Sequence, residues 1–351
     1  MTLHFIETTQ TSEGWQSAFA FQVFHRPAKE WKEMRWGFNT GVLLEEALDR
    51  NRLFLESQAV NETVFFEDTT PTRTLAIRGI NLPGSGLQMA VLGKVTAPDK
   101  TEAEQGGQSY AREVFSTFPH DFILKPTASK PEFDRLTGNA LLLNNPSVVC
   151  IQRENTFIPP MRGFHYLNGF WQASTRSNEQ IWRAMFGMDK MLAFNVLLQP
   201  TILFEDEKEL LLEIKKKVLD SKDKPDIFLP YYPWVESYIK RRLAPWKKFF
   251  LLQVHVIAEG TVDENIARTI GSAMTRESND TPLPGFHVTR PNTADEETEW
   301  CEDIRLLNLI PPQRRMDDLA DVEEAFSVFR LPLPHELGLP GAGFIEPSNV
   351  V

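Results

Sequence analysis

The sequence predicts an α+β protein: a strand-rich N-terminal region, then two related β-α-β-α subdomains of the split βαβ type with a helical insert between them. Three observations lead to this fold class. Aromatic and β-branched runs separated by Pro, Gly and Asn occupy residues 1–95. The order strand, capped helix, strand, capped helix then occurs twice, about 160 residues apart. Finally, 351 residues with 42% hydrophobic side chains suffice for a large core and two or three domains.

Residues 1–95 are expected to form mostly strands. Four runs have strand composition and are separated by turn signals: FAFQVFH, TVFFED, RTLAIRGI and LQMAVLGKV. One helix is expected among them, at about Leu43 to Leu55. Gly84 and Gly86 predict a turn before the last of these strands.

Residues 90–145 are predicted to form the first α/β subdomain. The strand MAVLGKV leads to Asp99 and Glu102, whose spacing is that of a capping box at the start of a helix. A second strand, FILKP, follows. Ser129 and Glu132 then repeat the capping-box spacing and predict a second helix.

The same order of signals predicts a second α/β subdomain at residues 249–330. The strand FFLLQVHVIA precedes Thr261 and Glu264, and the strand FHVTRP precedes Thr293 and Glu296, each pair at capping-box spacing. In both subdomains a Pro closes the second strand. We therefore infer an internal repeat whose helices cover one face of a sheet.

Residues 146–248 are predicted to be a mostly helical insert. Apolar side chains recur at helical spacing in NEQIWRAMFGMDKMLAFNVLL, and EDEKELLLEIKKKVLDSKDK predicts a charged helix with one apolar side. The run Lys215–Lys217 is expected to face solvent. Residues 331–351 are rich in Pro and Gly and predict a linker without regular structure.

Composition and charge exclude several classes of protein. The formal net charge of -11 argues against a chain whose whole surface wraps nucleic acid. The sequence has no apolar run of about 18 residues and no recognisable signal peptide, so we expect a cytoplasmic protein without membrane insertion. Cys150 and Cys301 are expected to be core or semi-buried thiols without a disulfide. Two acidic groups are expected to be solvated helix faces: Asp295, Glu296, Glu297, Glu299, Glu302 and Asp303, and Asp317, Asp318, Asp321, Glu323 and Glu324.

No catalytic, cofactor-binding or metal-binding motif is recognisable. Gly93 and Lys94 are followed by Val95 and lack a Gly five positions earlier, so a phosphate loop is absent and we expect no ATP or GTP binding. The seven His residues follow no metal-ligand pattern, and there is no G-x-S-x-G elbow. Glu213 and Lys215 form an E-x-K pair, which some nucleases use on a strand, but here the pair falls in a helical pattern.

One basic segment, SYIKRRLAPWKKFF, has aromatic residues between its cations. It supports two interpretations. The first is weak contact with DNA, in which cations meet phosphates and aromatic rings stack on bases. The second is the end of an amphipathic helix, whose cations are favoured by the helix dipole, followed by a buried strand. The candidate contact residues are Lys240, Arg241, Arg242, Trp246, Lys247 and Lys248.

Two pieces of sequence resemble the region that precedes the motor in bacterial ATPases of the HerA/FtsK superfamily, including the VirB-type conjugation ATPases. One is MAVLGKVTAPDKTEAEQGGQSYAREVFSTFPHDFILKP, echoed in LLQVHVIAEGTVDENIARTIGSAM. The other is AFSVFRLPLPHELGLPG, which is similar to the Phe-Arg-x-Pro and Leu-Pro-Gly junction before the motor domain. The resemblance covers residues 90–345.

The resemblance implies that ATP hydrolysis and hexameric DNA or protein translocation belong to a P-loop motor located after Val351. This chain would then contribute assembly, docking of protein partners or guidance of the substrate, in conjugation, type IV secretion or phage defence. The resemblance implies no catalytic residue, cofactor or metal in this chain. Two alternatives are a free-standing scaffold or adaptor, and a hydrolase or nuclease whose site is assembled only by the fold.

Overall fold

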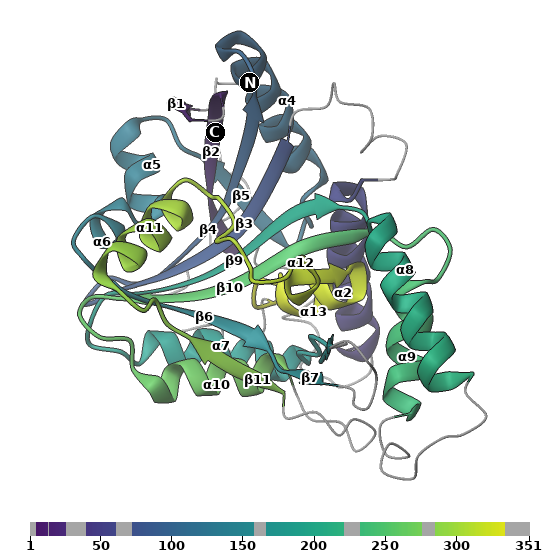
Figure 1. Cartoon of the computed structure of the whole chain (residues 1–351). Coiled ribbons are helices and arrows are strands. Elements are labelled where there is room, and N and C mark those ends of the chain that lie inside the picture. Colours follow the sequence, from purple (N-terminus) through teal and green to yellow (C-terminus); the bar gives the residue numbers. More distant parts are fainter. Residues whose placement is uncertain are drawn as a thin grey trace.

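The predicted α+β class is confirmed by a computed structural model, in which helices cover both faces of a ten-stranded antiparallel sheet (Figure 1). The structure describes residues 5–12, 14–25, 40–60, 72–157, 166–220, 232–275 and 285–333. The expected strand TVFFED and residues 334–351 of the expected linker lie outside the described residues.

The order of strands across the sheet brings distant parts of the sequence together. From one edge to the other it is β1 (Ile6–Thr11), β2 (Gly14–His25), β4 (Gly86–Ala97), β3 (Thr72–Leu82), β9 (Leu192–Thr201), β10 (Phe249–Ala258), β6 (Ser147–Arg153) and β11 (Phe286–Thr289). Two further strands belong to the sheet. β5 (Phe122–Pro126) pairs with β2 on the same side as β1, and β12 (Leu319–Asp321) pairs with β10 on the same side as β6. A separate pair is formed by β7 (Asn155–Phe157) and β8 (Tyr166–Asn168).

The sheet consists of two halves with the same topology. In chain order the halves are β2-α2-β3-β4-α4-β5 and β6-α7-β9-β10-α10-β11, with the helices α2 (Thr40–Gln58), α4 (Lys100–Thr117), α7 (Thr175–Phe186) and α10 (Glu264–Met274). Across the sheet the strands lie in the orders β5-β2-β4-β3 and β11-β6-β10-β9. Each half is therefore a complete β-α-β-β-α-β unit, the ferredoxin-like or split βαβ arrangement. Each half begins two strands and one helix earlier than the subdomain boundary predicted from the sequence.

The predicted internal repeat also appears in details of the two halves. Asp99 and Asp263 are the N-caps of α4 and α10, and each accepts a hydrogen bond from a backbone N–H of the first turn. The prediction that Thr261 caps the second helix was therefore wrong by two positions. Gln88 and Gln253 follow a Leu at matching points of β4 and β10, and each buried amide donates to a backbone carbonyl on the same face.

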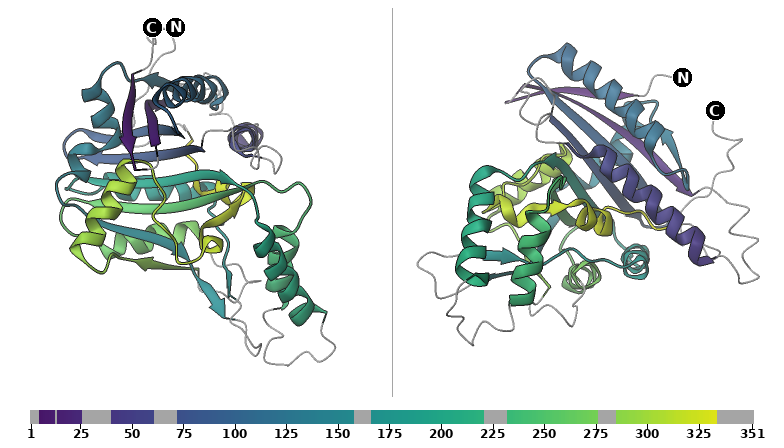
Figure 2. Two further views of the ribbon diagram at one scale, coloured as in Figure 1. Left: turned by 45° about the horizontal axis from the view of Figure 1, so that its top comes forward. Right: turned by 90° about the vertical axis from the view of Figure 1, so that its right-hand side faces the viewer.

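Helices cover the two faces of the sheet in different ways (Figures 1 and 2). α2, α4, α7 and α10 share one continuous core with one face of both halves. The opposite face is covered by α5 (Lys130–Thr137), α6 (Asn139–Leu142) and α11 (Ala294–Arg305). α5 and α11 follow β5 and β11, so they too occupy matching places in the two halves. Thr293 caps α11 as predicted, whereas Ser129 precedes α5 without a side-chain hydrogen bond.

The prediction that residues 146–248 are a mostly helical insert missed two strands of the main sheet, β6 and β9. The predicted helix in NEQIWRAMFGMDKMLAFNVLL ends at Phe186, and Leu192–Thr201 forms β9. β9 is buried on both sides, because it lies between β3 and β10 under helices on each face. Its apolar run is therefore continuous, and a short continuous run does not distinguish a strand from a helix.

Helices do follow β9, as predicted, and they form a hairpin that the first half lacks. α8 (Glu205–Ile214) continues into a π-helix, η2 (Lys215–Leu219), and α9 (Tyr232–Arg242) packs against them. In Figure 2 this hairpin extends away from the sheet. Glu213 and Lys215 lie on these helices, as expected, and Glu213 forms an ion pair with Lys217. No helix in the described ranges is long and apolar enough to cross a membrane.

Arg78 lies where the two halves meet. β3 pairs with β9 along the joint, and Arg78 is directly opposite Asn195 in this pairing. Arg78 is 1% exposed, and its Nε donates to Asn195 Oδ1 at 2.9 Å. Its two other nitrogens donate to the carbonyl oxygens of Thr137, the last residue of α5, and Ile304, in the last turn of α11.

The ends of two helices compensate the buried charge of Arg78. Carbonyl groups at a helix C-terminus lack partners within the helix and carry partial negative charge. Burial lowers the pKa of Arg78 to about 9, which leaves the guanidinium protonated at neutral pH. Burial and the charge of Arg78 lower the pKa of the adjacent His255 to about 3, so this His is neutral. One cation thus joins α5, α11 and both halves of the sheet.

We predict that Arg78→Met destabilises the protein by roughly 3 kcal/mol or more, because three buried acceptors lose their donor. The control is Arg73→Met on the same strand, since Arg73 pairs with Glu113 at the surface and both side chains are about one-third exposed. We expect the control to cost less than about 1 kcal/mol. Urea unfolding of the variants measures both values, and equal losses would contradict the role given to Arg78.

Candidate functional site at the C-terminal strap

The last described segment of the chain crosses both halves of the sheet, and we call residues 315–333 the strap. It begins with α12 (Arg315–Asp318), continues as β12 along β10, and turns into α13 (Val322–Val328). Asp321 and Glu324 form the capping box of α13: the Asp321 carboxylate accepts from Glu324 N at 3.0 Å, and Asp321 N donates to the Glu324 carboxylate at 3.1 Å. This D-x-x-E spacing fixes where the helix starts.

The strap connects the second half to the first. Asn178 of α7 donates to the carbonyl of Arg330 at 3.0 Å, and His25 at the end of β2 hydrogen-bonds to the carbonyl of Pro332 at 2.8 Å. α13 packs on α2. Leu331 and Leu333 are buried in the core that the two halves share. The expected linker at residues 331–351 therefore begins as packed chain, because its first apolar side chains fill this core.

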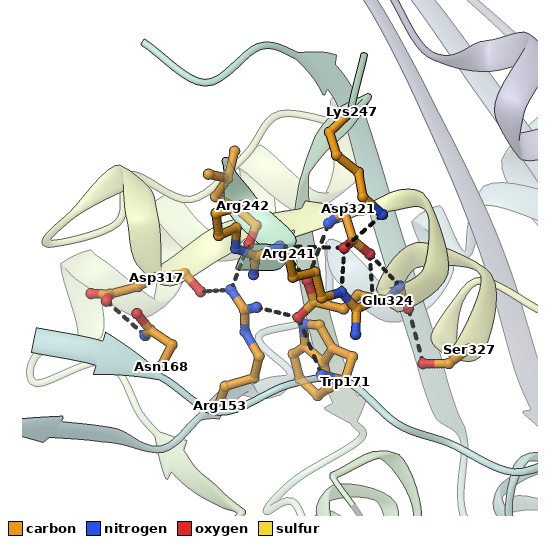
Figure 3. Close-up of polar contacts among 11 residues, drawn as sticks. Arg153, Asn168, Trp171, Arg241, Arg242, Lys247, Asp317, Asp321, Glu324 and Ser327 are labelled. Atoms are coloured by element: carbon orange, nitrogen blue, oxygen red, sulfur yellow. Dashed lines mark hydrogen bonds and ion pairs between the residues drawn. The ribbon is translucent and has the colours of Figure 1, made fainter. Parts of the chain in front are cut away.

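Two buried arginines share one buried carboxylate at the start of α13 (Figure 3). Glu324 forms ion pairs with Arg153 of β6 at 2.7 Å and with Arg242 of α9 at 2.5 Å. All three side chains are fully buried. Arg153 also donates to the carbonyls of Asp317 and Leu319, and Arg242 to that of Leu319, at 2.5 to 3.0 Å. The strap is thus held through both its backbone and its side chains.

A second buried carboxylate, Asp321, neutralises the next two cations. Arg241 binds it through two hydrogen bonds, and the Lys247 ammonium lies 3.6 Å away. Burial alone would raise the pKa of Asp321, but the hydrogen bonds from Arg241 and the charges of Arg242 and Arg241 outweigh it and hold the pKa well below its usual range. Asp321 is therefore ionised at neutral pH.

Aromatic rings complete the surroundings of the four cations. The two carboxylates, Glu324 and Asp321, are outnumbered by the cations around them, which are Arg153, Arg241, Arg242 and Lys247. Arg241 lies 4.9 Å from the ring centre of Phe170, and Arg242 lies 5.0 Å from that of Tyr238. The negative faces of such rings attract cations. Together with the strap carbonyls they compensate the excess positive charge in this largely buried cluster, which we call the strap network.

The six predicted DNA-contact residues have different positions in the structure. Arg241, Arg242 and Lys247 belong to the strap network, and Lys248 donates to the carbonyl of Glu56 at 3.1 Å. Lys240 and Trp246 are exposed. The segment is the end of α9 followed by the buried strand β10, which is the second interpretation of its sequence. Contact with nucleic acid stays a prediction, and only Lys240 and Trp246 offer it a freely exposed side chain among the six.

The expectation of solvated acidic faces was correct for the first group and wrong for part of the second. The acidic residues of α11 are exposed or half-buried. In contrast, Asp318, Asp321 and Glu324 are at most 3% exposed. The capping-box spacing of Asp321 and Glu324, followed by an apolar run, was the signal that could have revealed the buried helix start. Their arginine partners are distant in sequence and could not be recognised.

The strap network is suited to fixing a segment in place, since both of its carboxylates are saturated by cations. Elsewhere, Cys150 and Cys301 are buried free thiols, as expected. Burial raises the pKa of both, so neither is a reactive thiolate. Among the described residues, no three His, Cys, Asp or Glu side chains are placed to hold a metal ion.

No protein-family model matches this sequence, and a search of curated proteins finds no significant match.

We predict that Glu324→Gln costs about 3–5 kcal/mol, because it leaves the buried Arg153 without a carboxylate partner and Arg242 with only Asp321, 4.0 Å away. Adding Arg242→Met should recover part of this loss, since one stranded charge is then removed. Glu264→Gln is the control, because Glu264 pairs with Arg268 on an exposed face of α10 and should contribute less than about 1 kcal/mol. Chemical denaturation gives all four free energies of unfolding; a Glu324→Gln protein as stable as the control would contradict the network.

Asp318 should make the stability of the protein depend on pH with a sign opposite to that of the contribution of Asp321. Its carboxylate accepts from Gln253 Nε2 at 2.7 Å, and burial raises its pKa from 3.8 to about 7. The folded protein therefore binds this proton more tightly than the unfolded chain does. The contribution of Asp318 to stability consequently falls as the pH rises from 3.8 to about 7. Asp318→Asn should be more stable relative to wild type at pH 8 than at pH 4. A difference independent of pH would contradict this.

Proposed function

We propose that this chain is a non-catalytic assembly module of a DNA- or protein-translocating ATPase of the HerA/FtsK type, acting in conjugation, type IV secretion or phage defence. In this proposal it docks partners or guides the substrate. A P-loop motor, on the same polypeptide or on a partner protein, hydrolyses ATP. The observation that carries the proposal is the strap, which binds the end of the described chain to both halves of the sheet.

The strap includes part of the sequence through which the chain resembles such ATPases. Phe329, Arg330 and Pro332 belong to the Phe-Arg-x-Pro motif, and all three are buried against the body of the protein. A force applied to the chain after Leu333 would act on α13, on the strap network and on the β12–β10 pairing together. A junction held in this way is what a module needs if it is to move as one body with a motor.

The two alternatives predict different complexes. A free-standing scaffold or adaptor would act without any P-loop protein, and the α8–α9 hairpin, present in one half only, is the element best suited to specific docking. An enzyme with a fold-assembled site would turn over a substrate without ATP.

The test is to place an affinity tag on the chromosomal gene and to purify the complex under native conditions. We expect peptides with a G-x-x-x-x-G-K-[S/T] loop at one copy per copy of this chain, and ATPase activity in the purified complex. The Glu324→Gln variant should keep the motor but lose coupling between ATP hydrolysis and translocation, because the junction is loosened. Native mass spectrometry that finds this chain without a stoichiometric P-loop protein would contradict the proposal.

A further inference from the structure

Trp246 combines two unusual features. Its side chain is 98% exposed, and its φ of 62° lies in the left-handed region, where Gly is the usual residue. A Trp at this position strains the backbone and buries no surface within the chain. Nothing in the described fold therefore accounts for an aromatic side chain here, and such exposed aromatic residues commonly serve as binding anchors.

The turn that carries Trp246 is held rigidly at both ends. Before it, Arg241 and Arg242 are fixed in the strap network. After it, Lys247 pairs with Asp321 and Lys248 donates to the carbonyl of Glu56. A side chain presented on a rigid turn loses little conformational entropy on binding.

Two lysines close to Trp246 in the sequence reach the surface, although the whole chain is acidic. Lys240 is exposed and has no ion-pair partner among the residues that the structure describes, and Lys247 is 31% exposed. The surface that accepts Trp246 is therefore expected to be a hollow with an apolar floor and acidic walls.

The chain itself contains such a hollow. A cavity of about 510 Å³ lies between α11, the strands β6 and β11, and the chain before α12. Trp300, Ile310 and Pro312 supply its apolar surface, and Glu296, Glu299 and Asp303 its acidic side chains. Asp317, His287, Arg290 and the paired Arg153 also line it, so acidic groups outnumber cations. Its volume is in the range of pockets that enclose a ligand of several rings.

We propose that Trp246 of one copy inserts into the α11 cavity of a second copy of this chain. The contact joins two different surfaces, so it is head-to-tail, and repetition closes into a ring when the rotation allows. The inference deepens the proposed function, since a ring is the assembly expected of a translocating motor. The opposite charges of the two surfaces favour this contact and make it sensitive to salt.

Two variants separate the two sides of the contact. Trp246→Gly removes the ring and suits the left-handed backbone, so its stability should equal or exceed that of wild type. Glu299→Arg reverses a charge at an exposed position of the cavity. Sedimentation of wild type, at concentrations up to the order of 1 mM, should show association beyond a dimer, weakened at least about tenfold in each variant. In an equimolar mixture, Trp246 of the Glu299→Arg variant can still enter the intact cavity of the Trp246→Gly variant. This single contact cannot repeat, so the mixture should form dimers only.

Photo-crosslinking identifies the contact directly. With p-benzoylphenylalanine at position 246, we expect intermolecular adducts within residues 294–313. Wild type that stays monomeric, or adducts elsewhere, would overturn the inference. So would single-stranded DNA binding that is lost in Trp246→Gly while association is unchanged, because Trp246 would then be a base-stacking residue. All measurements use this chain alone, so they can succeed when no motor is found, and the proposed function can fail separately.

Discussion

The buried guanidinium of Arg78 determines how the two halves of the sheet are joined. A β-α-β-β-α-β unit leaves the edge of its second strand open, and here the two such edges, β3 and β9, pair with each other. Arg78 sits in this pairing and also binds the C-terminal ends of α5 and α11. The helix that follows the last strand of each half is thereby placed on the same face. Arg78 thus ties the joint to the helices on this face, and its charge adds to the effect of burial in keeping His255 neutral.

The strap network also compensates buried arginine charges, but with carboxylates instead of helix ends. Arg78 has no carboxylate partner among the described residues, and its charge is balanced by helix ends. Arg153 and Arg242 are instead balanced by Glu324, on a segment from a remote part of the sequence. A buried ion pair adds little net stability, but a missing partner is costly, so such a pair favours one docking geometry over others. This explains how a short strap, with only three residues paired to β10, is held in one position.

The sequence revealed the parts of the fold that depend on local signals. Capping-box spacing located α4 and α11, and the repeated order of strands and helices indicated the duplication. β6 and β9 were missed, because a strand buried on both faces lacks the alternation that identifies a half-buried strand. The strap network was missed for another reason. KRRLAPWKK and DVEEAF each resemble solvent-exposed segments, and only the fold brings their opposite charges together. Contacts between distant residues leave no periodic pattern in a single sequence.

The central claim is that the strap makes the two halves one mechanical unit. Native-state hydrogen exchange tests it most directly, because it gives the opening free energy of each segment separately. We expect amides of β12 and α13 to exchange with the same opening free energy as those of β3 and β9, and to lose protection together with them as denaturant is added. If the strap opened at much lower free energy than the sheet, or if the two halves opened independently, the account would be contradicted.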